Sequence, residues 1–398
     1  MIYLDNAATS HPKAPGISEA MGAFLAETDA NPGRAGHRMA VAAEQMMDDL
    51  RLALCRMFDA GEPARMIFAL NCTDALNMAI KGVLLADKPD GAPHVVTTVV
   101  EHNSVSRPLQ SLADRGRIEL TRVDCDDLGW VDPDDIKRAV TPATRMIVMT
   151  HASNVVGTIQ DAATVGQIAR EHEVLFCLDA AQTVGVLPIS IEQMQIDLLA
   201  FPGHKSLLGP TGTGGLYVGQ RCGDPGAPAP PGDAANRLAA WREGGTGGDS
   251  SSPTQPPLLP YYLEGGTPNT VGLAGLAAAI TYLKSRDMPA TLEHERRLCQ
   301  AVIDRFADDP RITLYGPRDT SQRAGALSIN IAGYEPADVG AILDDSFDIA
   351  VRPGLHCAPY LHRRLGTFAE GTVRISPGPF STVEDMGALM EAIEEIAG

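Results

Sequence analysis

The sequence predicts an α/β fold, in which a parallel or mixed sheet is covered by helices and followed by a smaller α+β unit. Short apolar runs alternate with helical patterns through the first two thirds of the chain, the order that builds such a sheet. From residue 324 onward apolar and polar residues alternate instead, as in strands with one face in water. The 398 residues are 44% hydrophobic and 21% charged, which suits about two to three folded domains.

Six apolar runs of strand length are expected to form the sheet: residues 66–70, 94–98, 146–150, 174–178, 198–201 and 215–218. Between the third and the fourth run, Val165, Ile168 and Ala169 fall on one helical face, the spacing of a helix that packs on a sheet. This succession of strand and helix predicts a layered domain.

The rest of the chain predicts a loop, two strands and a closing helix. Seven of the twelve residues 221–232 are Gly or Pro, which indicates an exposed loop. Residues 327–331 and 373–376 alternate like half-buried strands. Ser381 and Glu384 are expected to form the capping box of the last helix, whose apolar stripe is Val383, Met386, Leu389, Met390, Ile393 and Ile396.

Charge and cysteine content exclude several classes of protein. The chain has 32 Lys and Arg residues and 50 Asp and Glu residues. The resulting net charge of −18 repels nucleic acid and anionic membranes. The chain shows no membrane-spanning run and no leader pattern, so a cytoplasmic location is expected. Its seven cysteines are odd in number and lack a Cys-x-x-Cys pair, which argues against a disulfide framework and against a metal site.

Two side chains follow predicted strands and suggest a cofactor. Lys205 comes just after the run 198–201, and partial desolvation there would lower the pKa of its amine and free it to form a Schiff base. Asp179 ends the run 174–178, at the edge where open α/β sheets bind ligands. Such a pair suits pyridoxal phosphate (PLP), which needs a carboxylate beside its ring nitrogen. A solvated loop lysine and a strand-end acid are the alternatives.

A third strand end could receive the phosphate. Asn71, Cys72 and Thr73 open a helix, where free N–H groups, the helix dipole and the Thr73 hydroxyl would bind an anion. An ordinary helix cap is the alternative. The glycine-rich stretch 211–215 runs into a strand rather than a helix, so it does not fit a dinucleotide-binding loop.

Seven short segments follow one another along the chain: residues 3–9 (YLDNAAT), 101–104 (EHNS), 153–158 (SNVVGT), 179–182 (DAAQ), 203–205 (GHK), 264–270 (EGGTPNT) and 352–357 (RPGLHC). In this order they resemble segments of the cysteine desulfurases, in the class V aminotransferase superfamily. The resemblance spans nearly the whole chain. It implies PLP fold type I, with a mostly parallel seven-stranded sheet in a large domain (14–270) and a small α+β domain (1–13 and 271–398).

The resemblance also implies a role for individual residues. Lys205 would hold PLP covalently, with Asp179 at the ring nitrogen, Gln182 at the ring hydroxyl, and His102 stacked on the ring and active in proton transfer. The phosphate would contact Cys72, Thr73, His204 and, from the other subunit of a homodimer, Thr267. The substrate carboxylate would bind Asn154 and Arg374, with Arg352 nearby. The sequence departs from the family pattern at Pro202, Cys72 and Pro353.

Cys357 is the residue that the resemblance singles out as the sulfur carrier. Gly354 would make its loop mobile, His356 would be an adjacent base, and the positive charge of Arg352 would favour a thiolate. The other six cysteines are expected to be inert. Only 16 residues separate Cys357 from Arg374, which resembles the subclass with a short cysteine loop and implies slow turnover without an acceptor, or a preference for selenocysteine.

The implied activity converts L-cysteine to L-alanine and leaves the sulfur on Cys357 as a persulfide. A sulfur-acceptor protein, serving iron–sulfur assembly or another pathway, would then receive it. Rival functions are a selenocysteine lyase acting on L-selenocysteine or another PLP C–S lyase, a class V aminotransferase or epimerase, and a non-catalytic scaffold.

Overall fold

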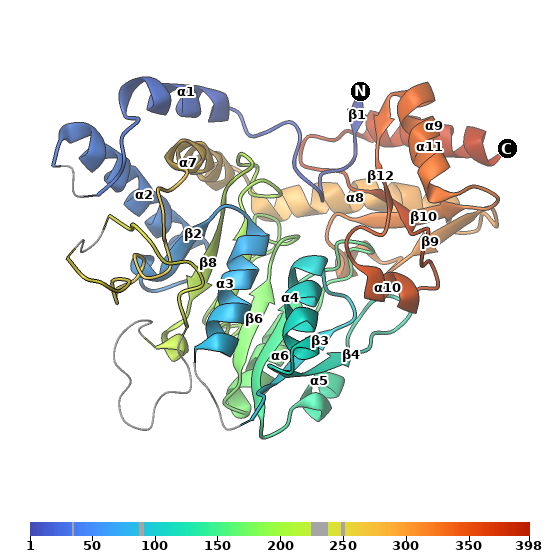
Figure 1. The fold of residues 1–398 in the computed structure, drawn as a ribbon. Helices are drawn as coiled ribbons and strands as arrows, with labels where there is room; N and C mark the ends of the chain where they lie inside the picture. Colours follow the sequence, from blue (N-terminus) through green and yellow to red (C-terminus); the bar gives the residue numbers. More distant parts are fainter. Residues whose placement is uncertain (34–35, 87–90, 224–237, 248–250) are drawn as a thin grey trace.

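The computed structural model describes residues 1–33, 36–86, 91–223, 238–247 and 251–398 (Figure 1). Of the predicted loop 221–232, residues 221–223 are described, and the first two of them belong to the short 3-10 helix η2 (Gln220–Cys222). Residues 224–232 lie outside the described residues. In the part of the chain that the structure covers, every helix is too short or too polar to cross a lipid bilayer.

A seven-stranded sheet forms the centre of the larger part of the molecule. Its strand order is β2-β8-β7-β6-β5-β3-β4. The five strands from β7 to β4 are parallel, whereas β8 is antiparallel to both β7 and β2. All six predicted strands are confirmed within two residues at either end: β2 (Met66–Ala69), β3 (His94–Thr98), β5 (Thr144–Thr150), β6 (Leu175–Asp179), β7 (Leu198–Pro202) and β8 (Gly214–Val218).

Helices cover both faces of this sheet because its strands are apolar on both sides. Phe176 and Leu199 point into one core, with helices α2 (Arg38–Met57), α5 (Pro133–Ala139), α6 (Ala162–Glu171) and α7 (Thr270–Lys284). Cys177 and Leu198 point into the other core, with α3 (Cys72–Leu85) and α4 (Asn103–Asp114). The seventh strand, β4 (Glu119–Val123), lies at the edge and is only partly buried. The predicted α/β fold is thus confirmed.

A second, antiparallel sheet of four strands supports the rest of the chain, in the order β12-β13-β10-β9. These strands are β9 (Ile312–Tyr315), β10 (Leu327–Ile331), β12 (Arg352–Gly354) and β13 (Thr372–Ile375). Helices α8 (Met288–Phe306), α9 (Pro336–Phe347) and α11 (Val383–Ala397) pack on it around a third core. The short strand β1 (Ile2–Tyr3) pairs with β11 (Ile349–Ala350), so the start of the chain lies beside this sheet (Figure 1). The division of domains at residue 270 stays a prediction.

The predicted capping box of the last helix is wrong by one residue. Thr382 caps α11 and exchanges hydrogen bonds with Asp385, whereas the Ser381 hydroxyl accepts from the Gly378 N–H at 3.0 Å. Val383 does not belong to the buried stripe either, since its side chain is 69% exposed. The turn before the helix engages Ser381, and this shifts the start of the helix to the next residue that can cap it.

Candidate active site

A cavity of about 190 Å³ lies where parallel strands β5, β6 and β7 end. Asp179 ends β6 and Pro202 ends β7, while α3 and α4 begin at the same edge. Its wall contains ten of the twelve predicted site residues: Cys72, Thr73, His102, Asn154, Asp179, Gln182, His204, Lys205, Arg352 and Arg374. Cys357 and Thr267 are not in the wall. The roles assigned to these residues stay predictions.

Asp179 is a buried carboxylate held by two donors. One of its oxygens, Oδ1, accepts from the Ala181 N–H at 2.9 Å and from the Cys72 thiol at 3.4 Å. Burial raises the pKa of Asp179, while the charge of Lys205 opposes this. The pKa of Cys72 is raised well above its usual value by burial and by Asp179, so Cys72 remains a thiol and donates. Cys72 therefore orients the carboxylate of Asp179 through its thiol.

Lys205 stands in a tight turn after β7. Gly203 permits this turn, because a Cβ atom there would lie 2.1 Å from the Thr213 hydroxyl oxygen. Lys13 fixes the turn from the other side by donating to the His204 carbonyl oxygen at 2.8 Å. Burial lowers the pKa of Lys205, and the charges of Arg374 and Arg352 act in the same direction. The amine is therefore easier to deprotonate than a solvated lysine.

His102 caps helix α4 and is held as a neutral ring. Its Nδ1 accepts from the Ser104 N–H at 3.0 Å, which places the ring proton on Nε2. Burial, followed by the charges of Lys205 and Arg352, lowers the pKa of His102 to about 3. The Ser104 hydroxyl lies 2.8 Å from both Nδ1 of His102 and the Thr73 hydroxyl. Ser104 thus connects the predicted stacking ring with the predicted phosphate ligand.

Arg374 enters the cavity from β13 and is only 1% exposed. Its Nη1 donates to the Asn154 carbonyl oxygen at 3.0 Å, and its Nη2 lies 2.5 Å from Oδ1 of Asp5. Nε of Arg374 is buried without a partner among the described residues. A guanidinium group fixed in this way keeps free donors for a planar anion such as a carboxylate.

Cys357 lies beside the cavity wall, with its sulfur 4.0 Å from Nη2 of Arg352. Its carbonyl oxygen accepts from the Asn103 N–H at 2.7 Å, and the preceding carbonyl, of His356, accepts from Nδ2 of Asn154 at 2.5 Å. The φ angles of His356 and Cys357 are +46° and +60°, a left-handed conformation that side chains other than glycine seldom adopt. These two contacts hold the strained segment against the cavity.

Two expectations about the residues before Cys357 are wrong. Gly354 does not lie in a mobile loop, because it pairs with Thr372 in strand β12. His356 is no base for Cys357, since its ring is buried and its Nε2 lies 3.1 Å from the Thr372 carbonyl oxygen, to which it donates. Burial and the charge of Arg374 lower the pKa of His356 to about 2. The backbone conformation turns this side chain toward the interior.

The other six cysteines are buried, which agrees with the prediction that they are inert: Cys55, Cys72, Cys125, Cys177, Cys222 and Cys299. Burial and the neighbouring Asp124 raise the pKa of Cys125 to about 12. Cys222 lies in η2 rather than in an exposed loop. Only Cys357 is partly accessible, so it is the one cysteine placed to react.

Three further residues help to form the site without having been predicted. Asp5 pairs with Arg374, Ser104 connects Thr73 to His102, and Lys13 holds the turn of Lys205. Asp5 and Ser104 stand inside the segments 3–9 and 101–104, which is the only signal in the sequence that could have pointed to them. Thr267 lines a different cavity, of about 780 Å³, so its predicted contact with the phosphate stays a prediction.

Comparisons with known proteins identify the class of this chain. A family model of the class-V aminotransferases matches residues 2–389, so the chain belongs to that family. It is 33% identical to probable cysteine desulfurases of Methanothermobacter thermautotrophicus (100% of this chain, 95% of the relative) and Pyrococcus abyssi (100% and 94%). The apo structure of a cysteine desulfurase from Thermococcus onnurineus matches with a TM-score of 0.90 at 31% identity (100% and 94%). Within the family the chain groups with the cysteine desulfurases.

PLP is the cofactor of this family, and the residues present fit it. Oδ2 of Asp179 makes no hydrogen bond among the described residues, so it is available to a protonated ring nitrogen. Asn71 caps the Asp74 N–H and leaves the N–H groups of Cys72 and Thr73 for an anion. Pro202 and Cys72 provide no hydroxyl for the phosphate, but these N–H groups and the Thr73 hydroxyl remain.

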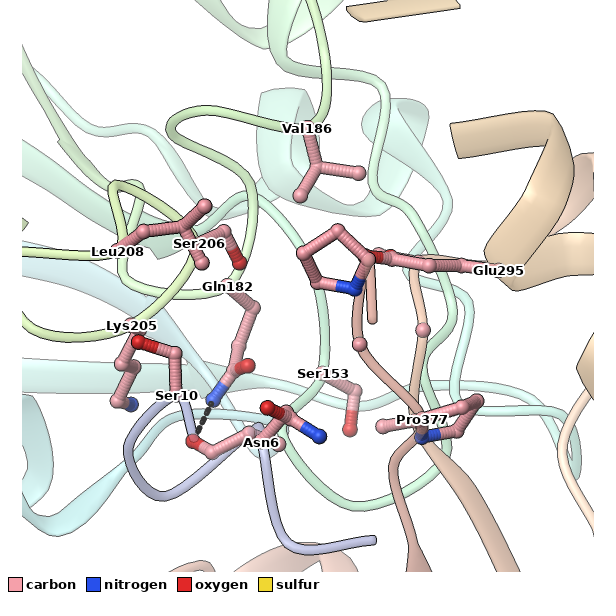
Figure 2. A pocket seen from close by; sticks show the side chains of 16 residues that line it. Asn6, Ser10, Ser153, Gln182, Val186, Lys205, Ser206, Leu208, Glu295 and Pro377 are labelled. Atoms are coloured by element: carbon pink, nitrogen blue, oxygen red, sulfur yellow. Dashed lines mark hydrogen bonds between the residues drawn. The ribbon is translucent and has the colours of Figure 1, made fainter. Parts of the chain in front are cut away.

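A small cavity of about 30 Å³ adjoins the site and shares Gln182 and Lys205 with it (Figure 2). Glu295 of α8 reaches into this cavity, is 5% exposed, and makes no hydrogen bond among the described residues. Burial raises the pKa of Glu295 to about 8. The carboxyl group is therefore protonated in the folded protein at neutral pH.

Glu295→Gln is expected to stabilise the protein in alkaline buffer. The pKa of this carboxyl group is about 8 in the folded protein and near 4.3 in the unfolded chain. The free energy of unfolding therefore decreases as the pH rises between these two pKa values. The advantage of the glutamine should grow by about 3 kcal/mol from pH 5.5 to pH 8.5, which urea unfolding at both pH values measures. Glu293→Gln, on the exposed side of the same helix, is the control. An equal pH dependence in both variants would contradict the assignment.

Proposed function

We propose that the protein is a desulfurase that converts L-cysteine to L-alanine and stores the sulfur on Cys357 as a persulfide. The observation that supports this most directly is the position of the one accessible thiol, 4.0 Å from a cationic side chain in the wall of the Lys205 cavity. The reaction balances, since L-cysteine and the Cys357 thiol yield L-alanine and the Cys357 persulfide.

The residues of the cavity wall would share the work of holding the cofactor. Lys205 would attach it, Asp179 would accept from its ring nitrogen, and the first turn of α3 would bind its phosphate. When bound, PLP supplies an electron sink for the carbon atoms of the substrate. His102 would offer its Nε2–H to the cavity, since Nδ1 is engaged by Ser104.

Arg374 would bind the substrate carboxylate through its unpaired donors, with Arg352 adding positive charge. This pairing would orient the substrate with its amino group toward Lys205. The sulfur of the substrate would then have to meet the sulfur of Cys357, whose segment is held by Asn103 and Asn154. Fixing both partners in this way brings the reacting atoms together at a high effective concentration.

In the sulfur-transfer step, the Cys357 thiolate would attack the sulfur of the substrate and form an S–S bond. The bond between that sulfur and the substrate carbon breaks, and its electron pair stays on the carbon. The carbon takes up a proton and becomes the methyl group of alanine, so carbon is reduced while sulfur is oxidised. Arg352 would stabilise the negative charge on the attacking sulfur.

We also infer a homodimer, in which Thr267 of each chain would reach the phosphate site of the other. Thr267 lies in its own large cavity, away from Lys205. Helices α1 (Ile17–Glu27) and α2 present exposed apolar side chains of the kind that subunit interfaces cover: Leu25, Met39, Val41 and Leu52. Light scattering would give the molar mass in solution.

The test of the proposed function is mass spectrometry of the PLP-loaded protein after incubation with L-cysteine. We expect one additional sulfur atom on the peptide that contains Cys357, and none on the peptide that contains the buried Cys125. L-Alanine should be the other product. Pyruvate without any sulfur on Cys357 would favour a C–S lyase, and a keto acid formed from an amino donor would favour an aminotransferase.

A further inference from the structure

We propose that Asp5 is a positioning residue, which holds Arg374 in the orientation that receives the substrate carboxylate and limits the charge that this arginine offers. The inference deepens the proposed function, because it rests on Arg374 as the carboxylate ligand. Asp5 stands at the very start of the chain and is separated from Arg374 by 369 residues.

The backbone places Asp5 beside Arg374 in a fixed register. Asp5 forms a parallel bridge with Ser376, two residues after Arg374. The Asn6 N–H donates to the Ser376 carbonyl oxygen at 3.1 Å. The Ser376 N–H in turn donates to the Leu4 carbonyl oxygen at 2.7 Å. The N-terminal segment is therefore bound to the end of β13 on both sides of Asp5.

The ion pair leaves part of the guanidinium group free. Nη2 of Arg374 donates to Asp5 at 2.5 Å and Nη1 donates to Asn154, so among the described residues two of the five N–H donors are used. Nε is both buried and unpaired, which is uncommon for a polar atom in a folded protein. The N–H groups of the two Nη atoms that Asp5 and Asn154 do not use belong to a side chain in the cavity wall, where a carboxylate could accept from them.

Charge gives Asp5 a second effect on the same ligand. Arg352 and Lys205 place further positive charge around Arg374 in the cavity wall. Asp5 is 21% exposed and is the acidic partner of the buried Arg374. Its negative charge offsets part of the attraction that Arg374 exerts on an incoming carboxylate. Orientation by Asp5 thus strengthens carboxylate binding, whereas its charge weakens it.

Two substitutions separate these effects. Asp5→Ala removes both the acceptor and the charge, so the guanidinium loses its orientation. Asp5→Asn keeps an acceptor oxygen at the same place and removes only the charge. The PLP-loaded protein is titrated with L-alanine and with L-alaninamide, which lacks the carboxylate, and binding is followed by the absorbance of the bound cofactor. Sulfur transfer plays no part in this readout.

For Asp5→Ala we expect L-alanine to bind about ten- to a hundredfold more weakly, the effect of losing a hydrogen bond to a charged group. L-Alaninamide should bind as it does to the unchanged protein. Asp5→Asn should bind L-alanine at least as tightly as the unchanged protein. The proposal is overturned if Asp5→Ala weakens both ligands equally or neither, or if Asp5→Asn loses as much affinity as Asp5→Ala.

Asn6→Ala is the matched control for a shift of the whole segment. Asn6 fixes the same turn by donating to the carbonyl oxygens of Tyr3 and Ser376, and among the described residues its side chain makes no hydrogen bond to Arg374. If Asn6→Ala also loses affinity for L-alanine but not for L-alaninamide, the effect belongs to the N-terminal segment as a whole, and the role of Asp5 is overturned. If the unchanged protein binds L-alanine no better than L-alaninamide, the substrate placement of the proposed function fails instead, whatever the variants do.

Discussion

The Cys357→Ala variant is expected to lose sulfide release from L-cysteine, measured with a thiol reductant, by on the order of 10³-fold or more, because no other group can take the place of a missing nucleophile. The absorbance of bound PLP should stay unchanged, since Cys357 does not line the cavity of Lys205. Sulfide formation and the visible spectrum of the purified protein measure the two effects.

The matched control for this variant is Cys125→Ala. Cys125 is buried, and burial and Asp124 raise the pKa of its thiol to about 12, so it has no reactive thiolate. Its replacement should leave sulfide release within about twofold of the unchanged protein. Full activity of Cys357→Ala would rule out the persulfide and would favour a C–S lyase or a selenocysteine lyase.

Lys205→Ala should lose both the bound cofactor and the activity. Lys205 is the one lysine in the cavity wall, and no other amine among the residues of that wall could attach PLP. We expect gel filtration to remove PLP from the variant, and L-cysteine turnover to fall by on the order of 10³-fold or more. The ratio of PLP to protein after the column and the rate of alanine formation measure these effects.

Lys284→Ala, at the exposed end of α7, serves as the control for a lost lysine charge. It should keep its cofactor and its activity. A Lys205→Ala protein that retains PLP through gel filtration and turns over L-cysteine at the usual rate would contradict the assignment of Lys205.

The strands could be predicted because burial on both faces leaves a strong local pattern. The runs that became β5, β6 and β7 are apolar at nearly every position, so each one is recognisable without its neighbours. Strand β4 shows no such pattern because it lies at the edge of the sheet, where Glu119 and Arg122 are tolerated. Edge strands need less apolar surface and resemble loops in sequence.

The site could be predicted where it depends on strand ends, but not where it depends on side-chain direction. Asp179 and Lys205 follow apolar runs, and the edge of a parallel sheet brings such residues together. His356 is adjacent to Cys357 in sequence, yet the left-handed backbone turns its ring inward. The pairing of Asp5 with Arg374 joins the two ends of the chain, and no local pattern announces a contact over such a separation.

The anchored segment around Cys357 has a consequence for conformational entropy. Fixing the backbone of one residue costs about 1–2 kcal/mol, so ordering the four residues 355–358 costs roughly 4–8 kcal/mol. The bonds from Asn103 and Asn154 and the turn from Ala358 to Leu355 make this ordering part of folding. A partner that binds at the Cys357 sulfur therefore does not have to order this backbone itself. Less of its binding free energy is lost to conformational entropy, so its affinity is higher.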